Sequence, residues 1–160
     1  MSDRAVTILH SGQTGVERGA HHGAIASGLP VRGFMRPEAR DELGPLPQDV
    51  AGVLTPCRDG GQRAALLATL GLATAVVLVV PDIRTAVRRR TSTWVLRSAR
   101  ANAIPYWLCD AVTSVTDVAS WYAQLASDAE HRILVTGPRA TRWKDGEMVA
   151  RRLVKSLALI

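Results

Sequence analysis

The stretch ILHSGQTGVERGAHHG (residues 8–23) decides the fold, because it passes from a short apolar strand through a glycine-rich turn into a helical segment of small residues. Gly12 and Gly15 allow positive φ values in that turn and let another part of the backbone come close to it. The small residues that follow recur on one side of a helix predicted at residues 14–27, which could therefore lie close against a sheet. The stretch predicts the first strand–loop–helix unit of an α/β fold.

The rest of the chain continues the alternation of strands and helices. Apolar runs predict strands at residues 5–10, 31–34, 75–80, 104–110 and 131–136. Helices are predicted at residues 61–70 and 91–102, at 116–125 with Thr116 and Asp117 as the cap, and at the C-terminus with an apolar stripe of Val149, Leu153, Leu157 and Ile160. The continuous run 75–80 is typical of a strand buried on both faces. We expect one α/β domain over residues 1–160, with a mostly parallel central sheet flanked by helices on both faces.

Composition narrows the function classes. The net charge is +6, but the four tryptophans are not interleaved with the basic clusters, so nucleic-acid binding is not expected. No apolar run is long enough to span a bilayer, and the N-terminus lacks the pattern of a signal peptide. Cys57 and Cys109 form no CxxC pair. We therefore expect a cytoplasmic protein that contacts no membrane.

Residues 36–59 are rich in proline, glycine and charged residues. This segment is long for a plain connection, and loops of that length in compact domains are often functional. The sequence therefore predicts a long loop here, with a lid as its candidate role.

Other polar residues form no catalytic or metal-binding pattern. His21 and His22 are adjacent and point to different sides of a helix, while His10 and His131 stand alone, so no metal site is predicted. Nothing in the sequence singles out one acid or base among the candidates Asp41, Glu42, Asp59 and Asp110.

The loops that follow the predicted strands carry the candidate site. In a parallel sheet the ligand crevice lies beyond the carboxyl ends of the strands. Each of the four loops predicted at that edge contains arginine, at residues 10–18, 35–40, 81–94 and 136–143. Thr14 is the predicted N-cap of a helix whose free N–H groups can receive a phosphate, and Arg18 could add positive charge. The turn at residues 137–139 presents an arginine at another strand end. The alternatives are ordinary turns for these loops and a solvated charged face for Arg88–Arg90. The first loop matches neither the Walker pattern nor GxGxxG.

SGQTGVER (residues 11–18) resembles the SGGQTGVDR signature of the molybdenum cofactor carrier proteins, a circularly permuted branch of the SLOG superfamily. ILVTGPRATRWKDGEMVARRLV (residues 133–154) is similar to the family's ending around GPRES. Weaker similarities follow the family's order between them, at residues 27–40, 63–77 and 90–110.

The resemblance implies a Rossmann-like homo-oligomer, a dimer or tetramer, that holds the molybdenum cofactor (molybdopterin) non-covalently. The cofactor's phosphate would rest on glycine-rich and helix-terminal N–H groups, without protein ligation of the metal. The binding residues carried over by position are Gly12, Gln13, Thr14, Gly15, Arg18, Arg63, Thr91, Ser92, Thr93, Gly137, Pro138 and Arg139.

The chain departs from the family pattern at several of these loops. Ser11 replaces a glycine, Glu17 replaces the aspartate, and a GGT turn becomes the TST of residues 91–93. Leu67 and Leu72 stand where the family has asparagine and aspartate. Two alternatives therefore stay open: a nucleotide-binding or phosphoribohydrolase-like enzyme, and a regulatory domain that binds a partner and has lost the pocket. The ligand's identity, and molybdenum against tungsten, are also open.

Overall fold

A five-stranded parallel sheet forms the centre of the computed structural model, which describes residues 5–86, 90–125 and 129–160. Its strands, in spatial order, are β2 (Val31–Arg32), β1 (Val6–Leu9), β9 (His131–Thr136), β7 (Ala75–Val79) and β8 (Tyr106–Cys109). Every neighbouring pair in this sheet is parallel. The predicted parallel α/β sheet is confirmed.

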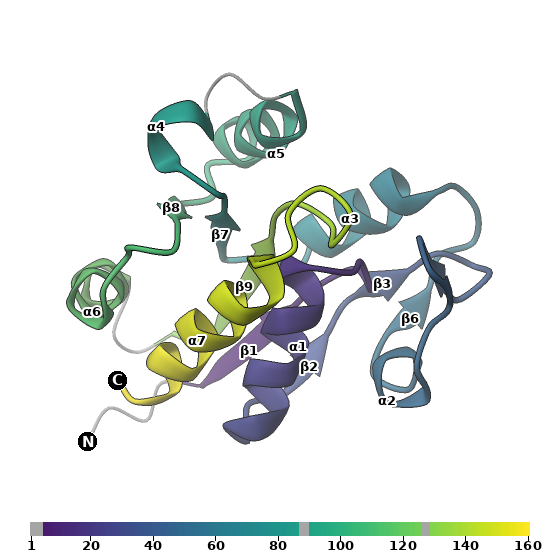
Figure 1. Cartoon of the computed structure of the whole chain (residues 1–160), viewed down its shortest axis with the longest axis horizontal. Helices are drawn as coiled ribbons and strands as arrows, with labels where there is room; N and C mark the ends of the chain where they lie inside the picture. The colour runs from purple at the N-terminus through teal and green to yellow at the C-terminus, as the bar shows by residue number, and fades with distance from the viewer. Residues whose placement is uncertain (1–4, 87–89, 126–128) are drawn as a thin grey trace.

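The last strand, β9, lies in the middle of the sheet between β1 and β7 (Figure 1). Its register sets Val6 opposite His131 and Ala75 opposite Ile133. Because parallel strands end at the same edge, the loops that follow β1 and β9 meet there, although they lie near opposite ends of the sequence.

Helices cover both faces of the sheet, as predicted. One face carries α1 (Val16–Ala26), α6 (Val115–Ala123) and α7 (Gly146–Ala158), and the other carries α3 (Gln62–Leu70) and α5 (Arg90–Ala101). Strand β7 is buried throughout, with Ala75, Val77 and Val79 in the first core cluster and Val76 in the second. Its position between two helical layers explains why every residue of the strand is apolar.

Helices α1 and α7 lie side by side in very close contact (Figure 1). A Cβ on Gly19 would lie 2.0 Å from the carbonyl oxygen of Glu147, and one on Gly23 would lie 2.8 Å from that of Arg151. The small residues of α1 therefore serve a helix–helix contact as well as the predicted contact with the sheet, where Val16 and Ala20 are buried.

The predicted loop at residues 36–59 was wrong in one respect, because the segment has structure of its own. It contains an antiparallel hairpin of β4 (Arg40–Asp41) and β5 (Gly44–Pro45), the short helix α2 (Gln48–Ala51), and β6 (Thr55–Pro56), which pairs with β3 (Phe34–Met35). A small separate core holds the segment together through Met35, Leu46, Val50 and Leu54. Elements of two to four residues leave no readable periodicity in a sequence.

Several other helices and strands begin or end at residues that differ from the predicted ones, for local reasons. The predicted strand 31–34 is interrupted at Gly33, whose φ is 152° and whose Cβ position would lie 1.8 Å from the carbonyl oxygen of His10. Helix α6 is capped by Ser114, which forms a capping box with Asp117, rather than by Thr116. The C-terminal helix ends at Ala158, before Ile160 of the predicted stripe. A short helix, α4 (Ile83–Ala86), follows β7. No helix among the described residues has the length and apolarity needed to cross a membrane.

Candidate anion-binding site

The turn after β1 has the backbone that its glycines predict. Gly12 and Gly15 have φ values of 85° and 75°. A Cβ on Gly15 would lie 2.6 Å from the carbonyl oxygen of Pro138, and that oxygen accepts a hydrogen bond from the Val16 amide at 3.3 Å. The close approach that the sequence predicted is therefore made with the loop after β9. Gln13 is half-buried in the same turn.

Thr14, which the sequence predicts as the N-cap of α1, does not occupy that position. Gly15 occupies that position, and α1 begins without a side-chain cap. The Thr14 hydroxyl instead accepts a hydrogen bond from the Ala140 amide at 3.0 Å and donates to Oε1 of Glu42. The side chain thus joins three loops rather than closing its own helix.

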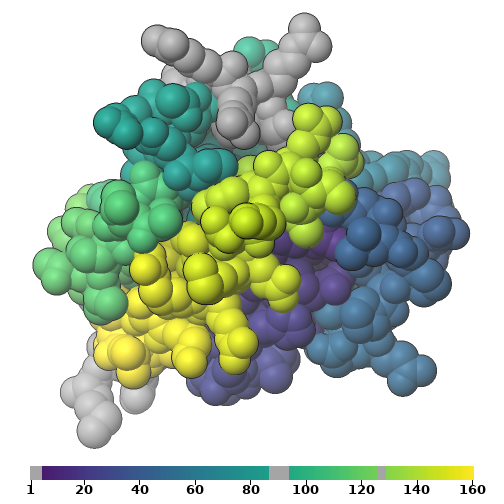
Figure 2. Space-filling model, in the orientation of Figure 1, coloured from purple at the N-terminus to yellow at the C-terminus, as the bar shows by residue number. Residues whose placement is uncertain are grey.

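Glu42, in the turn between β4 and β5, is the meeting point of these loops. Its carboxylate accepts hydrogen bonds from the hydroxyls of Thr14 and Thr141, both at 2.5 Å, and from the Thr141 amide at 3.2 Å. Nε of Arg139 lies 3.3 Å from Oε2 of Glu42. We call Thr14, Arg139 and Thr141 the cradle. Figure 2 shows the loop after β9 (lime) lying against the 36–59 segment (blue).

The cradle keeps Glu42 ionised. Desolvation by burial raises the pKa of this carboxyl, but the hydrogen bonds from Thr14 and Thr141 and the charge of Arg139 outweigh it. The net pKa lies below the ordinary value for glutamate. Glu42 therefore cancels the charge of Arg139 at neutral pH.

Arg18 likewise forms an ion pair with Asp41, the hairpin residue next to Glu42. Its Nη2 lies 2.7 Å from Oδ2 of Asp41, and the two side chains are only 13% and 4% exposed. Two consecutive carboxylates thus neutralise two of the three arginines that the sequence placed at the site, Arg18 and Arg139. The sequence offered no signal for this pairing, because both acids lie in a segment without periodic structure.

Two departures from the family signature contact each other beneath the turn. The amide and hydroxyl of Ser11 both donate to Oε1 of Glu17, at 2.5 and 2.6 Å, and the Thr136 hydroxyl donates to Oε2 at 3.3 Å. Gln62 donates from Nε2 to the Ser11 hydroxyl at 2.8 Å, which fixes the start of α3 beside the turn. Burial raises the pKa of Glu17 despite these donors.

A buried histidine pair holds the other side of the turn, so the prediction that His10 stands alone was wrong. The Gly12 amide donates to Nδ1 of His10 at 3.0 Å, which leaves the His10 proton on Nε2, 3.1 Å from Nδ1 of His21. Nε2 of His21 then donates to Oδ2 of Asp49 at 3.2 Å. The two histidines are eleven positions apart and meet only because the chain folds back. Elsewhere, the ring of His131 packs against that of Tyr122, with the ring centroids 6.0 Å apart.

Arg63 lies near this edge but outside the cradle. Its guanidinium carbon is 4.7 Å from the centre of the Trp94 ring. Thr91, Ser92 and Thr93 belong to the first turn of α5, and their side chains lie outside the part of the chain that the structure describes.

Gly137 lets the loop after β9 pass close to β7, since its Cβ would lie 2.2 Å from the carbonyl oxygen of Val79. Within the described residues, no group of three His, Cys, Asp or Glu side chains could hold a metal ion.

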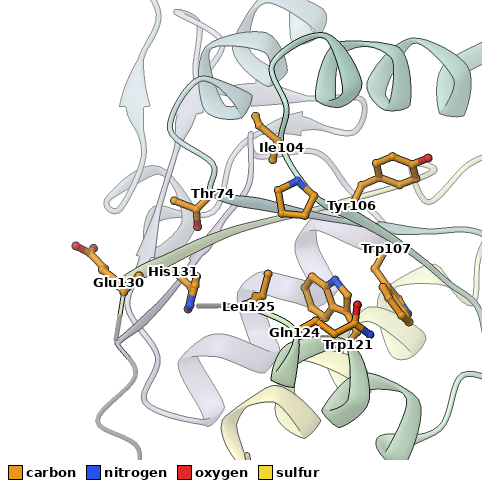
Figure 3. Close-up of a pocket in the computed structure, with 11 residues that line it drawn as sticks. Thr74, Ile104, Tyr106, Trp107, Trp121, Gln124, Leu125, Glu130 and His131 are labelled. Carbon is orange, nitrogen blue, oxygen red and sulfur yellow. The ribbon is translucent and has the colours of Figure 1, made fainter. Parts of the chain in front are cut away.

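A concavity lies at the opposite edge of the sheet, where strands β7, β8 and β9 begin (Figure 3). It has a volume of about 590 Å³. Thr74 and Ile104 face Trp121 and Leu125 across it, and the rings of Trp107 and Trp121 lie 5.7 Å apart. The predicted loops do not reach this edge, so this cavity is not the predicted crevice.

The chain matches a known protein family and a solved structure, and its fold agrees with both matches. A family model described as the circularly permutated YpsA SLOG family matches residues 8–158. The chain belongs to the circularly permutated YpsA SLOG family. Permutation of the chain agrees with the central place of β9, the last strand, in the sheet of this SLOG protein.

One solved structure shows the same fold. It is the crystal structure of a "Putative molybdenum carrier protein" from Syntrophus aciditrophicus SB, with a TM-score of 0.80 and 19% sequence identity, covering 96% of this chain and 94% of that one. This likeness confirms the Rossmann-like arrangement of the SLOG protein. No curated protein matches its sequence.

Proposed function

We propose that this SLOG protein binds and carries an anionic, phosphate-bearing small molecule without transforming it, and that the cargo is the molybdenum cofactor. One observation carries the proposal: the loops after β1 and β9 meet at one edge of the sheet, where α1 and α3 also begin. Neither helix has a side-chain cap, with Gly15 and Gly61 at the N-cap positions. The start of α3 is exposed, whereas the start of α1 is buried and its Val16 amide donates to the Pro138 carbonyl. Helix N-termini of this kind attract phosphate through their N–H groups and dipoles.

The surroundings of that edge suit a cargo with a flat ring system. Arg63 stacks over Trp94 beside the start of α3, and this pair offers a planar surface on which a pterin or purine ring could stack. Gln62, the neighbour of Arg63, is bound to Ser11 of the first turn, so the planar pair and the turn are held together. The name of the Syntrophus aciditrophicus SB structure supports a molybdenum-related cargo over a nucleotide.

Titration of the anaerobically purified protein with molybdopterin tests the proposal. We expect saturable binding to the wild type and a loss of affinity of about tenfold or more in Arg139→Ala, because that variant removes a cradle cation. Arg142→Ala is the matched control, since Arg142 is an exposed arginine of the same loop. AMP and GMP are titrated in parallel. Binding of a nucleotide without binding of molybdopterin would contradict the cargo assignment, and release of free base from either would contradict a carrier role.

The proposal includes a cytoplasmic homo-oligomer, a dimer or tetramer. Exposed apolar side chains on the outer helices, such as Ile25 of α1 and Met148 of α7, which are 56% and 69% exposed, could contribute to such an interface. Light scattering coupled to size-exclusion chromatography tests this part, and a monomer at micromolar concentration would contradict it.

A further inference from the structure

We propose that the cradle is a subsite for a ligand oxyanion, that Glu42 occupies it in the free protein, and that a ligand phosphate binds there by displacing the Glu42 carboxylate. The inference deepens the proposed function and rests on it for the class of ligand. It adds Thr141 to the binding residues and gives the β4–β5 hairpin a role as an internal competitor.

The cradle has the chemistry of an oxyanion site. It presents two hydroxyls, one backbone N–H and one guanidinium, and all of them point at the two oxygens of a single carboxylate. Hydrogen bonds to an ionised acceptor are stronger than those between neutral groups, and a phosphate offers the same donors two or three oxygens. The Glu42 carboxylate therefore stands where a ligand oxyanion would be held.

The Glu42 carboxylate and a ligand phosphate exclude each other from the cradle, because both are negatively charged. Glu42 is ionised, its side chain is only 13% exposed, and it lies against the single guanidinium of the cradle. Arg18 offers no compensation, because Asp41 already pairs with it. A phosphate entering beside Glu42 would bring a second negative charge next to that carboxylate with only one guanidinium to balance both, so it can bind well only when Glu42 leaves.

The Glu42 side chain can leave the cradle without unfolding the segment, while Asp41, the residue before it, stays paired with Arg18. Leu43, next to Glu42, is 75% exposed and belongs to none of the core clusters. The strands on either side are two residues long, whereas Leu46 and Val50 anchor the rest of the segment in its small core. Displacement of the Glu42 side chain therefore breaks polar contacts with the cradle and leaves both the Asp41–Arg18 ion pair and the apolar packing in place.

Calorimetric titration with inorganic phosphate tests the proposal on the full-length protein. We expect Glu42→Ala to bind phosphate about tenfold more tightly than the wild type, because the competitor is removed. Glu38→Ala is the matched control: Glu38 lies in the same segment, is 51% exposed and pairs with Arg36, so the variant changes net charge equally and leaves the cradle intact. Adding Thr141→Val to Glu42→Ala should abolish the gain.

A second variant guards against a folding defect. Glu42→Gln keeps a hydrogen-bond acceptor and loses the charge, so we expect a smaller gain in the same direction. Thermal unfolding of each variant identifies those that remain folded. Equal phosphate affinity in the wild type and the folded Glu42 variants would overturn the proposal, and so would an equal gain in Glu38→Ala or the absence of phosphate binding in every protein.

Molybdopterin titrations of the same variants separate this inference from the proposed function. Molybdopterin binding by the wild type, with no gain of phosphate affinity in the Glu42 variants, would overturn the displacement alone. A gain of phosphate affinity with no molybdopterin binding in any variant would overturn the cargo assignment alone and support the subsite.

Discussion

Nε2 of His10 lies 3.1 Å from Nδ1 of His21, and both imidazoles are completely buried. The pair joins the Gly12 amide at one end to the exposed carboxylate of Asp49 at the other. It therefore ties the first turn of the site to the 36–59 segment. Because each ring uses one nitrogen as donor and the other as acceptor, the arrangement needs two neutral histidines.

The first prediction is a loss of stability in mild acid. Burial is the main cause that lowers the pKa of His10 from 6.5 to about 3, and it lowers the pKa of His21 as well. The unfolded chain therefore takes up these protons first, so the stability is fully present above pH 6.5 and is lost as the pH falls toward 3. At pH 5 the His10 contribution is a loss of about 2 kcal/mol in the free energy of unfolding relative to pH 7.

Urea denaturation at pH 7, 6 and 5 measures this dependence. The comparison is with His10→Gln, which keeps one donor and one acceptor and cannot be protonated. The variant should show a flatter pH dependence, and identical slopes in the two proteins would contradict the assignment to His10.

The second prediction concerns Glu17 and has the opposite sign. Burial raises the pKa of this carboxyl above 4.5, so the folded state holds the proton more tightly than the unfolded state does. Stability from this group is present below pH 4.5 and is lost as the pH rises through the raised pKa. The isosteric Glu17→Gln variant should gain in free energy of unfolding relative to the wild type as the pH rises from 4.5 to 8. Glu130→Gln, which removes an exposed carboxylate whose ion-pair partner is Arg132, should show no such trend.

The third prediction tests the contact between α1 and α7. Gly19→Ala should lower the free energy of unfolding by about 3 kcal/mol, since the added methyl group would meet backbone rather than a movable side chain. Gly61→Ala adds the same group in open space and should lose only the preference of an N-cap for glycine over alanine, about 1 kcal/mol or less. Chemical denaturation of both variants decides the matter, and similar losses in the two would show that the helix contact is more tolerant than its spacing implies.

The fourth prediction concerns the planar surface next to the site. Arg63→Lys keeps the charge and loses the flat guanidinium over Trp94, so molybdopterin affinity should fall by about tenfold. Arg97→Lys makes the same exchange at an exposed position of α5 and should leave the affinity unchanged. Fluorescence of the tryptophans offers an independent readout. Unaltered affinity in Arg63→Lys would remove this surface from the proposed site.

Local sequence determined the frame of this SLOG protein. The run at residues 75–80 is apolar at every position, because its strand is buried on both faces, and the sequence therefore predicted a parallel sheet. The strand at residues 131–136 and the helix after Gly61 were also correctly placed. Gly12 and Gly15 were predicted to permit positive φ in the first turn, and both adopt it.

The tertiary structure decided which polar groups meet. Glu42 contacts Thr141 across ninety-nine positions, and neither residue belongs to a repeating pattern that a sequence can show. The charges of Arg18 and Arg139 were legible in the sequence, but their neutralisation by Asp41 and Glu42 was not. The physical reason is one of range: propensity, periodicity and turn chemistry act over a few residues, whereas burial and electrostatic pairing depend on which distant segments the sheet order brings to one edge.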